Sequence, residues 1–187
     1  MGTKQSNLLG TCGRRGRRGL TLIEAAIVLA VVAIVAATVA PSFAAYIDAR
    51  RLEGAATRLA ADVQFARSEA AARNRPLRLS FHATAALSCW VVHTGAAAQC
   101  NCDVGGAAVC TGGAVEIRTV VLPAAERIGV AANVGSIVFD PLHGTSTPTG
   151  TLRLFDGRGR AVHHVVNVMG RVRSCSPGAA MPAWRTC

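Results

Sequence analysis

Hydrophobic residues in this chain form one long run, followed by two kinds of periodic pattern. From residue 25 to residue 40 every residue except Thr38 is apolar, and the run begins at Leu20. The 21 residues from 20 to 40 would span about 31 Å as an α-helix, which is enough to cross the core of a bilayer. The run therefore predicts a transmembrane helix over residues 20–41.

Apolar residues then recur at intervals of three and four, which is typical of a helix with one buried face. Pro76 has no amide hydrogen and biases Arg75 toward an extended conformation, so we expect the helix to end near Asn74. An amphipathic continuation is expected over residues 42–75, either as one helix or as two hinged at Pro41. The buried stripe consists of Leu52, Ala56, Leu59, Val63, Ala66 and Ala70.

From Leu77 onward apolar and polar residues alternate, as on a half-buried β-strand. The turn sequence Asp156-Gly157-Arg158-Gly159 predicts a hairpin. The fold class is α+β: a long N-terminal helix, transmembrane in its first half, packs on a small antiparallel β-sheet domain over residues 76–187. Further strands are expected at Cys89–Thr94, Val115–Leu122, Ser136–Asp140, Thr151–Phe155 and Ala161–Met169.

The N-terminal end of the apolar run carries two kinds of charge. Residues 1–19 hold five basic residues, and a basic block beside an apolar run keeps the N-terminus in the cytoplasm. This block also resembles the first region of an export signal. Glu24 lies inside the run, where an unpaired carboxylate costs about 3 kcal/mol or more, so its presence indicates a function.

The residues Gly19-Leu20-Thr21-Leu22-Ile23-Glu24 resemble the type IV pilin (class III) signal. The resemblance implies that residues 1–19 are a leader, that a prepilin peptidase cuts between Gly19 and Leu20, and that Leu20 is then methylated. Leu20 stands where the family usually has Phe. The new ammonium at Leu20 would lie one helical turn from Glu24, so the two charges can pair within or between subunits. A signal anchor or a secretory signal cut before residue 41 remains the alternative, but neither explains Glu24.

The second half of the chain resembles the GspH/FimT family of minor pilins and pseudopilins. The resemblance rests on Phe139-Asp140-Pro141, a loop at Gly144, Gly150-Thr151, a hairpin and Gly170-Arg171-Val172-Arg173. It implies a structural protein of the bacterial inner membrane with a periplasmic β-rich domain. Its partners would be the prepilin peptidase and other pilins of a type IV pilus. The alternative is a GspH-like pseudopilin of a type II protein secretion system.

The C-terminal arginines suggest one more partner. In FimT-type minor pilins a Gly-Arg-x-Arg motif is associated with DNA binding in natural transformation, and Gly170, Arg171 and Arg173 match it. If Val172 points inward, both arginines share an exposed face, and a flexible Gly170 would let double-stranded DNA approach the backbone. A solvated basic face, or pairing with acidic neighbours in a filament, is the alternative.

The charge distribution strengthens this interpretation. The chain has 20 basic and 10 acidic residues, for a net charge of +10. The segment 150–187 holds six arginines against one acidic residue, Asp156, for a net charge of +5. Those arginines are Arg153, Arg158, Arg160, Arg171, Arg173 and Arg185.

Six cysteines follow the leader, and in an oxidising periplasm an even set predicts disulfides, with 15 possible connectivities. The pilin resemblance favours Cys175–Cys187, because C-terminal disulfide loops recur in that family. A zinc site built from Cys100, Cys102, Cys110 and a histidine is the alternative, although the spacing is unusual for zinc. The other cysteine after the leader is Cys89.

Motifs for catalysis are missing from the sequence. His163 and His164 are adjacent on an expected strand, so they point to opposite faces. Ser80 and His82 lie close in sequence but lack the turn context of a nucleophilic serine. We therefore expect no enzymatic activity, no cofactor and no metal.

Overall fold

The computed structural model describes residues 21–103, 105–179 and 181–187. The chain divides into two compact units, one ending at Ser42 and the other running from Phe43 to Cys187. Helix α1 (Leu22–Arg73) contributes residues to both units and continues through Pro41, so the chain forms one helix here rather than two.

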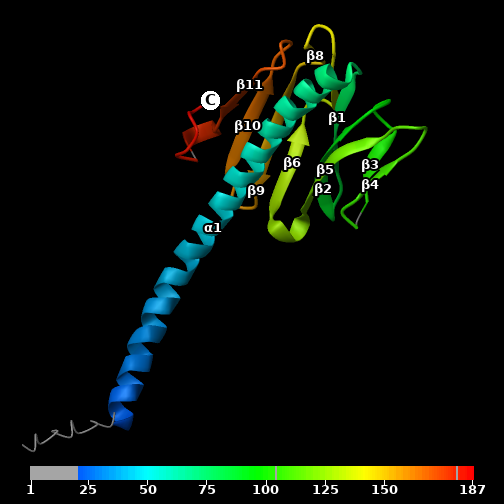
Figure 1. Ribbon diagram of the computed structural model, residues 1–187. Helices are drawn as coiled ribbons and strands as arrows, with labels where there is room; N and C mark the ends of the chain where they lie inside the picture. Colours follow the sequence, from blue (N-terminus) through cyan, green and yellow to red (C-terminus); the bar gives the residue numbers. More distant parts are fainter. Residues whose placement is uncertain (1–20, 104, 180) are drawn as a thin grey trace, which may run out of the picture. The chain divides into compact units, whose positions relative to one another are not determined.

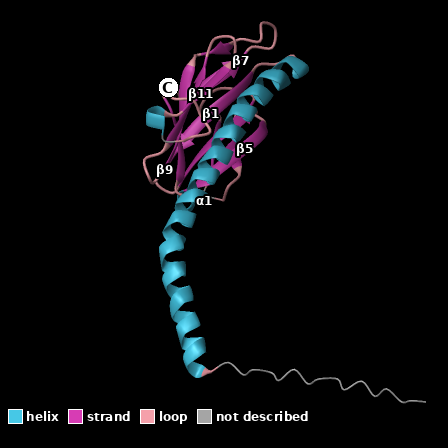
Figure 2. Cartoon of the chain, turned by 90° about the vertical axis from the view of Figure 1, so that its left-hand side faces the viewer, coloured by secondary structure: helices cyan, strands magenta, loops and turns pink. Residues whose placement is uncertain are grey.

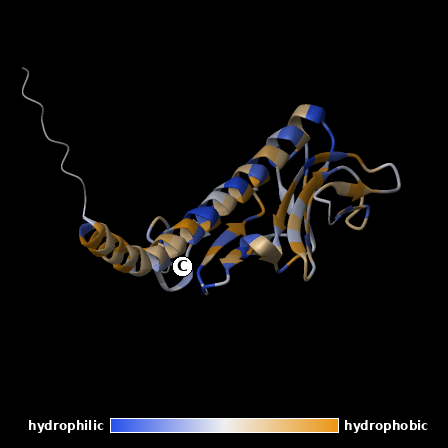
Figure 3. Ribbon diagram, turned by 90° about the horizontal axis from the view of Figure 1, so that it is seen from below, coloured by the Kyte–Doolittle hydropathy of each residue, from blue (hydrophilic) through white to orange (hydrophobic). Residues whose placement is uncertain are grey.

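The N-terminal half of α1 is predominantly apolar (Figure 3), apart from Glu24 in its first turn and Thr38. By length and hydropathy, α1 qualifies as a membrane-crossing helix. Large apolar side chains along this half are exposed in the single chain, among them Leu22, Ile23, Leu29 and Ile34. Exposed apolar surface of this extent marks a segment that a membrane or another protein covers.

The second half of α1 buries one face on the β-sheets (Figures 1 and 2). The predicted stripe is confirmed, because all six of its residues are fully buried. Asp62 lies on the same buried face, where its carboxylate accepts hydrogen bonds from Trp90 Nε1 at 2.8 Å and Arg118 Nη1 at 2.7 Å. These two partners satisfy a charge whose burial would otherwise be costly.

The end of α1 follows the sequence prediction. Asn74 takes a left-handed conformation with φ of 50°. The amides of Asn74 and Arg75 donate to the carbonyls of Ala71 and Ala70, at 3.2 and 3.1 Å. This is the pattern of a Schellman motif, and it satisfies the last carbonyls of the helix before Pro76.

The strands form two antiparallel sheets and a small ribbon, so the α+β class is confirmed while the expected single sheet is divided. The five-stranded sheet has the order β5 (Glu116–Pro123), β2 (Leu87–His93), β1 (Leu77–Ala83), β7 (Ser136–Phe139) and β8 (Ser146–Thr147). The four-stranded sheet has the order β11 (Val172–Cys175), β10 (Ala161–Val166), β9 (Gly150–Asp156) and β6 (Ile128–Ala132). The ribbon pairs β3 (Cys100–Cys102) with β4 (Ala108–Cys110), and the 3-10 helices are η1 (Ala124–Glu126) and η2 (Pro177–Ala179).

One expected strand is shorter than the pattern predicted. Strand β10 ends at Val166 rather than at Met169, because the chain turns between Asn167 and Gly170. The amide of Gly170 donates to the Asn167 carbonyl at 2.9 Å, and Asn167 donates to the Arg171 carbonyl at 3.1 Å. This turn creates the edge strand β11, which the pattern did not predict.

The four-stranded sheet has two different faces. His164 on β10 pairs with Leu152 on β9, and its Nε2 donates to the carbonyl of Ala56 in α1, so this face packs under the helix. The opposite face carries Arg153, which is exposed, and its cross-strand partner His163, which is half-buried. Residues alternate between the two faces, as the two-residue period of a strand requires.

Candidate functional site

The residues predicted to take part in N-terminal processing lie partly outside the described chain. Gly19 and Leu20 are outside the described residues. Glu24 is exposed in the first turn of α1, and its amide donates to Thr21 Oγ1 at 3.3 Å. Thr21 and Glu24 have the spacing of a capping box, and a carboxylate at a helix N-terminus is favoured by the helix dipole. Glu24 therefore suits the start of the helix, while its carboxylate is accessible to a partner.

The six cysteines from Cys89 onward form three disulfides in the structure. Cys175–Cys187 is the pair that the pilin resemblance favoured. The other two are Cys89–Cys102 and Cys100–Cys110, which the sequence did not distinguish from other pairings. All three cysteines of the alternative zinc site are thus oxidised. Within the described residues, no three His, Cys, Asp or Glu side chains are grouped to hold a metal.

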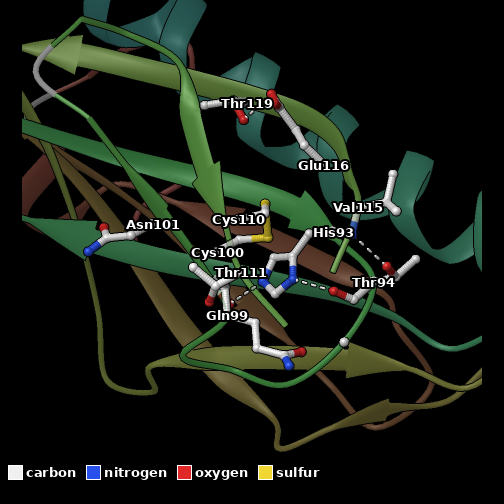
Figure 4. The surroundings of a disulfide bond; sticks show 12 residues. His93, Thr94, Gln99, Cys100, Asn101, Cys110, Thr111, Val115, Glu116 and Thr119 are labelled. Carbon is white, nitrogen blue, oxygen red and sulfur yellow. Dashed lines mark hydrogen bonds between the residues drawn. A yellow bond between two sulfur atoms is a disulfide. The ribbon is translucent and has the colours of Figure 1, made fainter. Parts of the chain in front are cut away.

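Two of these disulfides organise the segment between β2 and β5. Cys100 and Cys110 are direct cross-strand partners in the β3–β4 ribbon and are joined by a disulfide (Figure 4). The disulfide from Cys102 to Cys89 ties the ribbon to β2. Gln99 adds two bonds: its Oε1 accepts from the amide of Ala96 at 2.7 Å, and its Nε2 donates to the Gly112 carbonyl at 3.3 Å. The segment is thus held by covalent and polar contacts rather than by a large apolar core.

A serine and a histidine do pair, but in the core. Ser80 Oγ lies 2.8 Å from His93 Nε2, and His93 Nδ1 lies 2.8 Å from the Thr94 carbonyl. Since only an N–H can donate to that carbonyl, Nε2 accepts from the serine. Burial lowers the pKa of His93 and keeps the ring neutral. Both side chains are fully buried, so this pair joins strands β1 and β2 and is closed to a substrate.

Two of the six C-terminal arginines form ion pairs with acidic side chains. Arg160 contacts Asp156 through Nε at 2.7 Å and Nη2 at 2.6 Å, and its Nη1 donates to the Ala45 carbonyl at 2.9 Å. Arg158 donates to Asp48 Oδ2 at 2.9 Å, and this hydrogen bond lowers the pKa of Asp48. Both arginines therefore tie the β9–β10 turn to α1.

The other four arginines have a different environment. Arg153, Arg171, Arg173 and Arg185 are all exposed. Across the described part of the chain, none of these four guanidinium groups forms an ion pair. The Arg153 guanidinium lies over the ring of Phe155, with 5.4 Å to the ring centroid. These side chains retain their hydrogen-bonding capacity for an external anion.

Val172 points inward, which is the condition under which the sequence places Arg171 and Arg173 on one exposed face. Val172 is half-buried and packs against the core, whereas both arginines are exposed. Arg173 pairs with Val165 across β10 and β11 on the outer face of the sheet. The amide of Arg171 donates to Asn167 Oδ1 at 2.9 Å, which fixes the backbone at the start of β11. The motif is therefore presented on a hydrogen-bonded hairpin.

Gly170 has a role other than the expected one. It is buried, with φ of 68°, and an added Cβ would lie 2.8 Å from the Cδ atom of Arg67. Its carbonyl accepts from Gln64 Nε2 at 3.2 Å, while Arg67 Nε donates to the Gly144 carbonyl at 2.9 Å. Because α1 covers Gly170, a polyanion cannot approach its backbone. The glycine instead allows the turn that places Arg171 at the surface.

Sequence reasoning did not single out Arg153 and Arg185 as candidate contacts. The alternation Leu152, Arg153, Leu154 in an expected strand was a signal that Arg153 faces outward. His163, its partner on β10, is half-buried, and burial together with the charge of Arg153 lowers the pKa of His163. The ring is therefore neutral at pH 7 and leaves the arginines as the cations of this face.

Two comparisons with known families match the chain. Residues 55–170 match the family described as Type II transport protein GspH, and residues 14–40 match the prokaryotic N-terminal methylation motif. Neither a curated protein nor a solved structure matches the chain. The GspH match ends at Gly170, so Arg171, Arg173 and the C-terminal disulfide lie beyond it. Because this match covers more than half of the chain, the protein belongs to the GspH family of pilin-like proteins and carries their N-terminal methylation motif.

Proposed function

We propose that this protein is a minor pilin of a type IV pilus-type filament, and that it binds extracellular double-stranded DNA through Arg171 and Arg173. Family membership implies processing by a prepilin peptidase and assembly with other pilins. In this proposal residues 20–41 anchor the chain in the inner membrane and then enter the filament core. The domain from residue 76 onward lies in the periplasm, because basic residues 1–19 retain the N-terminus in the cytoplasm. The role is structural rather than catalytic.

The observation that carries the DNA proposal is the contrast among the C-terminal arginines. Arg158 and Arg160 are bound to Asp48 and Asp156, whereas the exposed Arg171 and Arg173 have no acidic partner among the described residues. A guanidinium donates two parallel hydrogen bonds to a phosphate and remains charged at any physiological pH. Contacts of this kind supply affinity for nucleic acid without a sequence preference.

Processing is the first part of the proposal to test. A cut between Gly19 and Leu20 leaves an ammonium that pairs with the Glu24 carboxylate of the same or a neighbouring subunit, which offsets the cost of a charge at membrane depth. The intact mass of the protein extracted from membranes should correspond to a chain beginning at N-methylated Leu20. A mature N-terminus near Pro41, or an uncut leader, would contradict the proposal.

DNA binding is tested with the full chain in a non-ionic detergent, in a gel-shift titration with duplex DNA at several salt concentrations. Two to four phosphate contacts predict a slope of roughly −2 to −4 for log affinity against log salt. The double variant Arg171→Gln, Arg173→Gln should bind more weakly and reduce that slope by about two. The matched control is Arg51→Gln, Arg58→Gln, which removes the same charge from exposed positions of α1. Equal losses in both double variants would contradict a local site.

The alternative is a GspH-like pseudopilin of a type II protein secretion system. The observation that favours it is the description of the matched family, which is a type II transport protein. A deletion strain of the native host separates the two functions. Loss of DNA uptake with normal protein secretion supports the pilus proposal, whereas loss of secretion with normal DNA uptake supports the alternative.

A further inference from the structure

The last residues of the chain are held in place beside β11. The Cys175–Cys187 disulfide closes a loop over this segment. Within the loop, the amide of Ser176 donates to the Arg185 carbonyl at 2.8 Å, and the amide of Cys187 donates to the Ser176 carbonyl at 3.2 Å. Trp184 packs edge-on against His164, with ring centroids 5.8 Å apart. Arg185 therefore has a defined position, even though it lies two residues before Cys187 in a loop with little secondary structure.

This loop and strand β11 enclose a recess of about 920 Å³. Arg173 lines it from the strand and Arg185 lines it from the loop, and among the described residues no Asp or Glu side chain contributes to the lining. Both guanidinium groups lack an ion-pair partner within the described residues. Two exposed cations at one recess whose described lining holds no acidic side chain form an anion-binding surface. The disulfide of the same loop positions one of the two.

Strand register places Arg153 on the same outer face. Arg153 pairs with His163, and His163 pairs with Cys175, so Arg153 and Arg173 are two strands and two residues apart. Strands lie about 4.8 Å apart and each residue advances about 3.3 Å, which gives a Cα separation of about 12 Å. The major groove of B-DNA is about 12 Å wide. The two arginines therefore have the spacing to contact phosphates on both sides of one groove.

We infer that Arg153 and Arg185 extend the DNA contact of Arg171 and Arg173 across the outer face of the four-stranded sheet. One DNA strand lies in the recess between Arg173 and Arg185, and Arg153 contacts the other strand across a groove. The side chains between them on β10 are Val165, which has no hydrogen-bonding group, and the half-buried His163, so arginine contacts to phosphates dominate on this face. The inference rests on the proposed DNA binding, and it makes duplex DNA, rather than a single strand or an acidic protein, the ligand that fits.

The test uses the full chain in detergent and single variants at the two added positions. Arg153→Gln and Arg185→Gln should each weaken duplex binding and reduce the salt slope by about one. Arg51→Gln, an exposed position on α1, is the matched control and should bind like the parent. If Arg171→Gln, Arg173→Gln weakens binding while Arg153→Gln and Arg185→Gln do not, the inference is wrong and the proposed function stands. If none of them changes binding, the proposed function fails as well.

The disulfide supplies an independent test of the recess. The variant Cys175→Ser, Cys187→Ser releases the loop that carries Arg185, so it should bind duplex DNA as weakly as Arg185→Gln. Adding Arg185→Gln to it should then cause no further loss, because coupled changes are not additive. A full additional loss would overturn the role of the loop.

Competition experiments examine the choice of ligand. A single strand of the same length, or poly-glutamate of the same total charge, should displace the duplex poorly, because neither spans a groove. Displacement by either one as efficient as by unlabelled duplex would overturn the two-strand geometry.

Discussion

The two faces of the four-stranded sheet differ although the same strands build them. On the inner face Leu152, Leu154 and Val162 are fully buried in the core under α1. On the outer face Arg153 of β9 and Arg173 of β11 are exposed. Val165 of β10, which lies between these two strands, is about two-fifths exposed. One residue along the chain thus separates a side chain that holds the fold from one that is available to a ligand. We expect stability and DNA binding to respond to different substitutions in this sheet.

The largest effect should come from the inner face. Leu154→Ala removes a fully buried side chain and leaves a cavity, which should lower the free energy of unfolding by about 2–5 kcal/mol. Arg153→Ala, at the adjacent outer position, should change it by less than about 0.5 kcal/mol. Urea denaturation of the unit Phe43–Cys187, which contains its own core, measures both values. Similar losses of unfolding free energy at the two positions would show that the two faces do not differ in their contribution to stability.

A smaller, pH-dependent effect should come from His164, a buried polar residue of the inner face. Burial lowers its pKa to about 4, and its ring is bonded to the Ala56 carbonyl and to Ser174 Oγ. The unfolded chain has a pKa near 6.5 at this position, so it binds the proton more readily than the folded chain does. The contribution of neutral His164 to the free energy of unfolding is therefore fully present above pH 6.5. The free energy of unfolding falls by about 3 kcal/mol as the pH decreases to 4.

The control for this prediction is His164→Gln, which has an amide in place of the titratable ring. Burial also lowers the pKa values of His93 and His163, so both proteins should lose some stability in acid. The difference in the free energy of unfolding between parent and variant isolates the contribution of His164. This difference should shrink as the pH falls from 7 to 4. A constant difference over that range would show that His164 does not titrate between the two states.

The helix and its boundaries were predictable because their signals are local. The three-and-four spacing from Leu52 to Ala70 reports a buried face directly, and Pro76 sets the end of α1 within a few residues. Strands β3, β4 and β8 were missed because two or three residues are too few for a recognisable alternation. Strand β6 was missed because its residues are mostly apolar and small, so they show no alternation of apolar and polar positions.

The candidate site was predictable only in part, for a physical reason. The sequence shows six arginines after residue 150, but pairing depends on distant residues such as Asp48, which meets Arg158 across 110 positions. The burial of Gly170 depends in the same way on a distant residue, Arg67 of α1. Arg185 gains its position through a disulfide, and spacing alone does not reveal which cysteines pair.

The C-terminal disulfide loop also protects an edge. Strand β11 is the outermost strand of its sheet, and Ser176, just after it, forms a parallel bridge with Thr186 of the loop. An uncovered edge strand offers free backbone groups to a strand of another molecule, which is a common route to aggregation. By occupying part of this edge with its own chain, the protein limits sheet-to-sheet association between copies. Association is thereby left to other surfaces, such as the exposed apolar half of α1.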